Sequence, residues 1–107
     1  MIKITIYQDS KSQFTGFDCE DHAEYAEAGA DIVCAAVSAL TITCMNSIEV
    51  LTDADFTQDV DEANAKISFR LTTSGSDAQL LIHSMVLGLE EIESNYSEYI
   101  DIIFKEV

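Results

Sequence analysis

One cysteine stands where a helix is expected to begin. Cys34 comes three residues after Asp31, and an apolar run from Ile32 to Leu40 follows that aspartate directly. A short polar residue in front of an apolar run is typical of a helix N-cap, which would place Cys34 in the first turn. Free amide hydrogens and the helix dipole favour the nucleophilic thiolate there. The position fits a catalytic nucleophile, and it also fits an inert small hydrophobe on an apolar helix.

A histidine precedes this cysteine by twelve residues. His22 lies in an acidic stretch, residues 20–30, that we expect to be a loop, and a loop of that length could bring an imidazole beside the sulfur of Cys34. His22 could equally be an exposed loop residue. Asp31 could orient the imidazole or simply cap the helix. Ser38, one helical turn after Cys34, could hydrogen-bond near the site or to the carbonyl oxygen of Cys34.

The other cysteines and the second histidine are not expected to take part in catalysis: Cys44 should lie in the core, Cys19 could lie near the site as a bystander, and His83 should be structural or solvent-exposed. Cys44 lies ten residues beyond Cys34, about 15 Å along one helix, so the two cannot form a disulfide within it. Cys19 ends an expected strand, and His83 falls among the apolar residues of a later helix. Three cysteines without a CxxC pair argue against a disulfide framework and a zinc knuckle, and they suit a reducing cytoplasm.

Metal and cofactor motifs are missing from the sequence. The acidic segment 53–64 lacks the glycine and the final glutamate of a calcium-binding loop, with Gln58 and Asn64 in their places. The chain also has no phosphate-binding glycine motif and no HExxH. We therefore expect no cofactor and no metal.

Charge and length limit the class of partner. The chain has 107 residues, and its 20 acidic residues against 5 Lys and Arg give a net charge of −15. That field repels phosphate backbones and attracts basic proteins, so we expect a basic protein partner and no nucleic acid. The longest unbroken apolar run, Ile32–Val37, is far below the roughly 20 residues that span a bilayer. A single cytoplasmic domain over 1–107, with no membrane contact, is expected.

Apolar periodicity predicts the elements that must position these residues. Ile2, Ile4 and Ile6 alternate as in a strand, and the apolar residues of the helix opened by Ser76 and Asp77 recur every three or four positions. The complete prediction is strands at 2–8 and 13–19, a helix from 32 to about 46 or beyond, strands at 56–60 and 66–71, a helix from 76 to about 96 and a strand at 100–104. This β-β-α-β-β-α-β order predicts an α+β domain with a mixed sheet covered by two helices.

The first helix is apolar around most of its circumference, which predicts burial on more than one side. Uncovered edges suggest a homodimer.

The stretch from His22 to Ala39, HAEYAEAGADIVCAAVSA, closely resembles the signature of the bacterial ribosomal-processing cysteine protease family, Prp. Residues 77–82 and 92–96 resemble the family's second helix, and length and element order agree over essentially the whole chain. The resemblance implies a cytoplasmic, homodimeric endopeptidase. Its substrate would be the bacterial large-subunit ribosomal protein number twenty-seven, from which it would remove an N-terminal extension after paired aromatic residues.

Carried over to this sequence, the resemblance implies Cys34 as nucleophile and His22 as general base and then acid, with Asp31 and Ser38 supporting the site. Backbone amides near Cys34 would stabilise the oxyanion of the tetrahedral intermediate. The loop 20–30, which includes Asp21 and Gly29, would admit the substrate. The family commonly has glycine where this chain has Asp21, and a side chain there restricts the backbone or favours the imidazolium of His22.

Two other functions remain compatible with the sequence. A non-catalytic assembly module could hold a basic ribosomal protein on acidic surfaces without cleaving it. A thiol redox sensor could use Cys34 with Cys19 as the resolving partner. Only the protease requires His22, so His22→Ala separates it from both alternatives.

Overall fold

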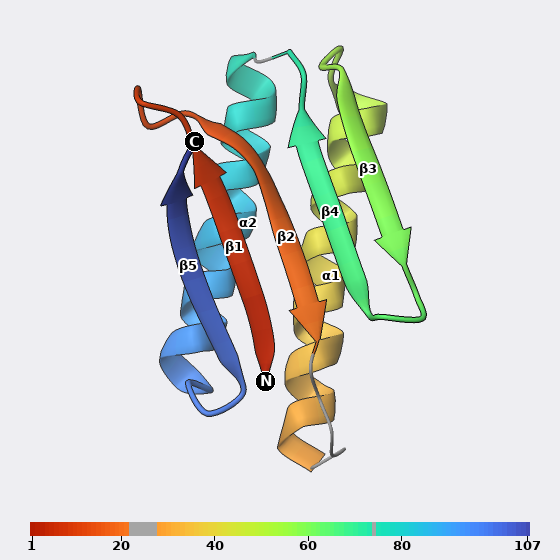
Figure 1. Ribbon diagram of the computed structural model, residues 1–107, viewed down its shortest axis with the longest axis vertical. Helices are drawn as coiled ribbons and strands as arrows, with labels where there is room; N and C mark the ends of the chain where they lie inside the picture. The colour runs from red at the N-terminus through yellow and green to blue at the C-terminus, as the bar shows by residue number, and fades with distance from the viewer. Residues whose placement is uncertain (22–27, 74) are drawn as a thin grey trace.

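The computed structural model describes residues 1–21, 28–73 and 75–107, with the backbone alone described for residues 28–31. Five strands form one mixed sheet in the order β3-β4-β2-β1-β5 (Figure 1). Neighbouring strands are antiparallel except β1 and β5, which are parallel. Their bounds are Ile2–Gln8 for β1, Phe14–Asp21 for β2, Phe56–Asp61 for β3, Lys66–Leu71 for β4 and Ile100–Glu106 for β5.

Two helices, α1 (Ala28–Leu51) and α2 (Ser76–Asn95), lie behind the sheet in Figure 1 and cover one of its faces. The predicted fold class and element order are confirmed. The core lies between the layers, because alternate strand residues point to the helices. The sheet contributes Ile4, Ile6, Phe17 and Phe69, all fully buried, and Phe69 stacks on Phe17 with ring centroids 5.2 Å apart.

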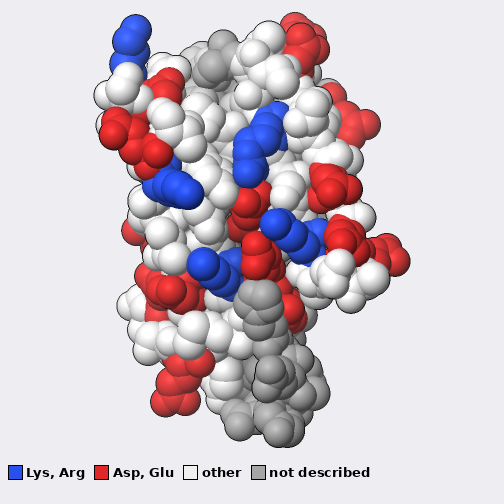
Figure 2. Space-filling view, in the orientation of Figure 1, with Lys and Arg blue, Asp and Glu red and all other residues white. Residues whose placement is uncertain are grey.

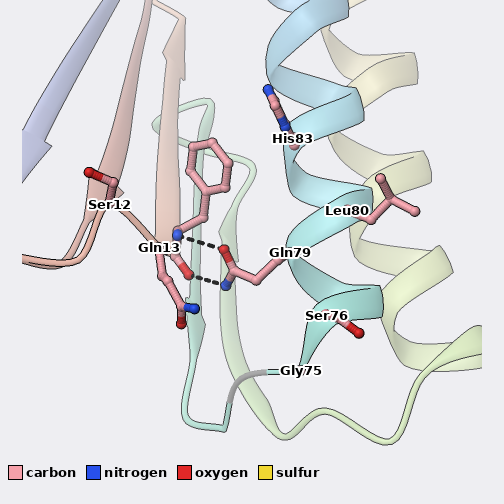
Figure 3. Close-up of a pocket in the computed structure, with 8 residues that line it drawn as sticks. Ser12, Gln13, Gly75, Ser76, Gln79, Leu80 and His83 are labelled. Atoms are coloured by element: carbon pink, nitrogen blue, oxygen red, sulfur yellow. Dashed lines mark hydrogen bonds between the residues drawn. The ribbon is translucent and has the colours of Figure 1, made fainter.

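The second helix begins where the sequence predicts. Its buried residues, Ala78, Ile82, Met85 and Leu89, recur at four- and three-residue steps and form the stripe that packs on the sheet. The side chain of Gln79 fixes this helix to the start of β2. Its amide oxygen accepts from the backbone N–H of Phe14 at 2.7 Å, and its amide nitrogen donates to the Phe14 carbonyl at 2.7 Å (Figure 3).

The first helix differs from the prediction at its start and in its burial. It begins at Ala28, so Asp31 is its fourth residue and the N-cap interpretation of Asp31 is wrong. The two alanines at 28 and 30 are strong helix formers, and an acidic residue is favourable in a first turn, so the helix extends backwards past Gly29. Predicted burial on several sides is also wrong, because Ile32, Ile42, Val50 and Leu51 are exposed.

Residues 32–51 of α1 form one segment that is long and apolar enough to cross a membrane by length and composition. A helix that packs in the core of a soluble protein passes the same test. In this fold α1 packs against α2 and contributes the buried residues Val33, Val37 and Ile48 to the core. The core therefore accounts for the buried side of α1, whereas Ile32, Ile42, Val50 and Leu51 are exposed.

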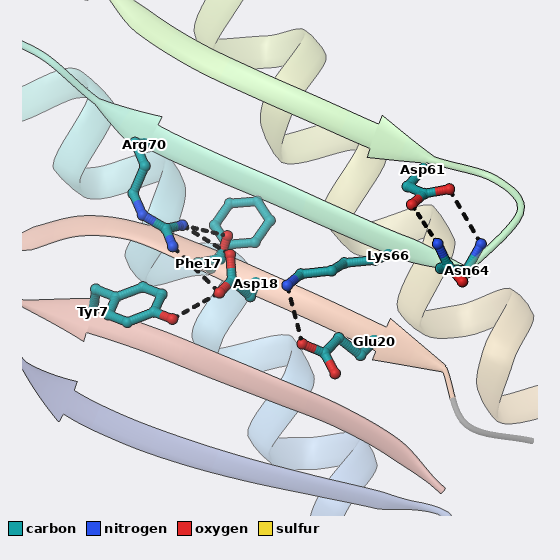
Figure 4. A network of polar contacts seen from close by, with 8 residues as sticks. All are labelled: Tyr7, Phe17, Asp18, Glu20, Asp61, Asn64, Lys66 and Arg70. Carbon is teal, nitrogen blue, oxygen red and sulfur yellow. Dashed lines mark hydrogen bonds and ion pairs between the residues drawn. The ribbon is translucent and has the colours of Figure 1, made fainter.

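The sheet face away from the helices is polar. Arg70 of β4 donates to both carboxylate oxygens of Asp18 on β2, at 2.9 and 3.2 Å, and the hydroxyl of Tyr7 on β1 donates to Asp18 at 2.6 Å (Figure 4). The Arg70 guanidinium also lies 4.2 Å from the centre of the Tyr7 ring. Lys and Arg side chains gather on this face among acidic ones (Figure 2), whereas α1 and α2 contain neither Lys nor Arg.

Candidate active site

The sulfur of Cys34 meets a carboxylate at the end of β2. Its Sγ donates to Oδ2 of Asp21 at 3.2 Å. Alternation along β2 explains the contact, because Phe17, Cys19 and Asp21 point to the helix side while Asp18 and Glu20 point to the open face. The contact joins the last residue of β2 to α1.

Cys34 lies deeper in the helix than the sequence predicts. It is the seventh residue of α1, in the second turn, because the helix begins at Ala28. An amide in a helix interior donates to the carbonyl four residues earlier, so the first-turn donors expected beside Cys34 are not next to it. The predicted activation of this thiol by free amides of the first turn is therefore wrong.

A pocket of about 280 Å³ opens beside Cys34. Its apolar wall, which we define as Val37 and Ile42 of α1, Val60 of β3 and Ile67 of β4, stands where the β3–β4 hairpin approaches the helix. The remaining lining residues are Ile2, Cys19, Asp21, Ser38, Asp61, Glu62, Ala65 and Lys66. The pocket therefore offers an apolar surface next to a partly exposed thiol.

The other two cysteines are poorly suited to reaction. Cys19 lines the pocket but is buried, and burial together with the negative charges of Asp21, Cys34 and Glu20 raises the pKa of its thiol to about 12. Burial alone raises the pKa of the Cys44 thiol to about 12. Both stay protonated at neutral pH. This argues against Cys19 as the resolving thiol of a redox sensor, since the thiolate is the attacking form.

The structure brings together some of the predicted site residues. Cys34, Ser38 and Asp21 line one pocket. Gly29 lies in α1 and not in the predicted loop, and Asp31 is the fourth residue of that helix, with its side chain outside the described residues. Asp21 ends β2 and is likewise not a loop residue. His22 lies outside the described residues.

A larger hollow, of about 520 Å³, lies at the other end of β2 (Figure 3). It is lined by Ser12, Gln13, Phe14, Gly75, Ser76, Gln79, Leu80 and His83. The ring of His83 lies 5.7 Å from that of Phe14, the first residue of β2, whereas Cys34 contacts Asp21, the last. This separation keeps His83 away from Cys34, and its side chain is exposed, which is one of the two placements predicted for it.

In the part of the chain that the structure describes, no group of three or more His, Cys, Asp or Glu side chains could hold a metal ion.

The sequence did not predict two features of the pocket. It gave Asp21 no contact with the thiol, and it did not place the apolar wall. Val60 and Ile67 face each other in the β3–β4 pairing, so a prediction of that hairpin's register would have joined them.

Comparison with known proteins identifies the family. The family model described as cysteine protease Prp matches residues 1–101. The ribosomal processing cysteine protease Prp of Bacillus subtilis is 33% identical over 103 residues, covering 92% of each chain. The crystal structure of Prp from Staphylococcus aureus with a substrate peptide matches at a TM-score of 0.92 and 30% identity, covering 98% of this chain and all of that one. A second structure of that protease, with a covalently linked product peptide, matches at a TM-score of 0.88 and 31% identity over 98% of this chain and all of that one. The chain belongs to the Prp family of cysteine proteases.

Proposed function

We propose that this cysteine protease removes the N-terminal extension of the bacterial large-subunit ribosomal protein number twenty-seven, with Cys34 as nucleophile and His22 as its base. The observation that carries the proposal is the placement of Cys34, the partly exposed cysteine, at a largely apolar pocket. An apolar pocket suits aromatic residues before the scissile bond. The matched Staphylococcus aureus structures, one with a substrate peptide and one with a covalently linked product, support a covalent mechanism.

The chemistry proceeds through an acyl-enzyme. His22 takes the proton of Cys34, and the sulfur attacks the scissile carbonyl carbon to give a tetrahedral oxyanion. The oxyanion collapses, the carbon–nitrogen bond breaks, and His22 gives its proton to the leaving amine. Water, deprotonated by His22, then attacks the thioester carbon and releases the acid product and the Cys34 thiol. Every proton is returned, so the cycle requires no cofactor and no metal.

The charge of the chain suits a basic substrate. The net charge is −15, and neither helix carries a Lys or Arg. A negative field of this size raises the encounter rate with a basic ribosomal protein more than it raises affinity. Cleavage by this enzyme is therefore expected to slow with increasing salt, mainly through the association rate.

The proposal includes a cytoplasmic homodimer. The outer side of α1 exposes Ile32, Val50 and Leu51, which are apolar and would gain from being covered. Light scattering coupled to size exclusion tests the dimer, and a monomer mass at micromolar concentration would remove it.

The function is tested by incubating the precursor of the host's own ribosomal protein with the wild type and with Cys34→Ala and His22→Ala variants. Mass spectrometry should find one cut after the paired aromatic residues with the wild type only. Replacing those aromatic residues by alanine in the substrate should abolish the cut. Binding without cleavage by the wild type would favour the non-catalytic assembly module, and full cleavage by His22→Ala would exclude the Cys34–His22 pair.

A further inference from the structure

We propose that Asp21 is a positioning residue for the nucleophile: its carboxylate holds the proton of the Cys34 thiol and keeps the resting enzyme in the thiol form. The inference deepens the proposed function, on which it rests for the role of Cys34. Its basis is the 3.2 Å bond between Cys34 Sγ and Asp21 Oδ2. An ionised carboxylate only accepts hydrogen bonds, so the sulfur must donate, and it can donate only while it carries its proton.

The fold holds this carboxylate in place. The backbone N–H of Asp21 donates to the carbonyl of Ala65 at 3.0 Å, and Asp21 pairs with Ile2 across the β1–β2 ladder. Both contacts fix the last residue of β2, and strand alternation directs its side chain to α1. A carboxylate on a fixed strand end can therefore hold the sulfur of Cys34 at a defined position.

Two other charged groups around the pocket are held by different partners. Lys66 of β4 reaches the carboxylate of Glu20 at 3.4 Å on the open face of the sheet. Asp61 of β3 accepts from the backbone and side-chain amides of Asn64, at 3.2 and 2.7 Å. Glu62 and Cys19 also line the pocket, and Cys19 is a buried thiol. Asp21 differs from these groups in contacting Sγ of Cys34 directly.

Loss of the thiol proton has two costs in this arrangement. The hydrogen bond to Asp21 disappears, and two negative charges are left about 3.2 Å apart. Repulsion between unit charges at that distance lowers the thiolate population about tenfold even with the dielectric constant of bulk water. Removing the charge of Asp21 should therefore raise the thiolate population of Cys34 and make Cys34 more reactive at neutral pH.

The experiment measures the rate of Cys34 alkylation by iodoacetamide against pH, read by mass spectrometry on the full chain. Asp21→Asn removes the charge and keeps the size of the side chain. Glu20→Gln is the matched control, because it removes the same charge one residue earlier on the opposite face of β2. Cys19 and Cys44 are buried, so their labelling would reveal unfolding. Asp21→Gly is the second variant in case Asp21→Asn does not fold.

We expect Asp21→Asn to alkylate Cys34 about tenfold faster than the wild type at pH 7, with the midpoint of the pH dependence moved to lower pH. Glu20→Gln should stay within about twofold of the wild type, because its charge is directed to the open face. An unchanged or slower rate in Asp21→Asn would overturn the proposal, and so would an equal acceleration in Glu20→Gln. Alkylation requires no substrate, so this result is independent of whether the enzyme cleaves the ribosomal precursor.

Discussion

Trimming the apolar wall of the pocket should weaken cleavage without unfolding the protein. Ile42 is 44% exposed and Val60 is 51% exposed, so about half of each side chain remains for an occupant to bury. Burying a whole aliphatic side chain of this size gains about 1.5–3 kcal/mol, so covering the exposed half of each gains roughly 0.7–1.5 kcal/mol. The double variant Ile42→Ala, Val60→Ala should therefore lose roughly 1.4–2.9 kcal/mol of transition-state stabilisation, about a 10- to 130-fold fall in kcat/KM.

The assay is kcat/KM for a peptide that spans the cleavage site, followed by mass spectrometry, together with urea unfolding of each variant. Leu87→Ala is the control, because Leu87 is 58% exposed, lies on α2 and does not line the pocket beside Cys34. It should leave kcat/KM within about twofold of the wild type. If the double variant unfolds like the wild type and cleaves with unchanged kcat/KM, the pocket beside Cys34 does not bind the residues before the scissile bond.

Three predictions concern the sheet and core that carry the site. Burial alone would raise the pKa of the Asp18 carboxyl, but the hydrogen bonds from Arg70 and its other partners outweigh burial and lower that pKa. The Asp18–Arg70 ion pair therefore stabilises the fold fully above about pH 4, and this stabilisation is lost as the pH falls through the lowered pKa. Asp18→Asn should therefore cost about 1–2 kcal/mol in urea unfolding at pH 6, and the difference from the wild type should shrink toward pH 2, whereas a constant difference would contradict the assignment. A Cβ on Gly16 would lie 2.2 Å from the carbonyl oxygen of Phe69, so Gly16→Ala should lower the free energy of unfolding by more than about 2 kcal/mol in urea. An unchanged free energy of unfolding would show that β2 and β4 can move apart at little cost. Leu89 is fully buried, so Leu89→Ala should cost about 2–5 kcal/mol in the same assay, and a loss below 1 kcal/mol would indicate that the core collapses to fill the space.

Local patterns in the sequence were enough for most of the fold. Alternating isoleucines predict β1, and the three- and four-residue steps of apolar side chains predict α2, because both signals come from one buried face. The start of α1 was missed because Gly29 and the nearby acidic residues suggested a loop. Helix formation by the neighbouring alanines outweighs the local cost of one glycine.

The contacts around Cys34 could not be predicted from local sequence patterns. The bond between Cys34 and Asp21 joins the helix to the end of β2, and it depends on where the strand ends and where the helix begins. The apolar wall requires α1, β3 and β4 to meet, which depends on the strand order of the sheet. Such long-range geometry is fixed by packing and not by residue spacing. The sequence therefore predicts which cysteine reacts, and the fold determines what surrounds it.

The most direct test of the central claim is to trap the acyl-enzyme. The protein is mixed with the extension peptide, quenched in acid within milliseconds to seconds, and analysed by intact and fragment mass spectrometry. If Cys34 is the nucleophile, the intact mass rises by that of the N-terminal fragment less one water, and the adduct maps to Cys34 as a thioester sensitive to hydroxylamine. Turnover with the adduct on Cys19 or Cys44, or undiminished turnover by Cys34→Ala, would contradict the account.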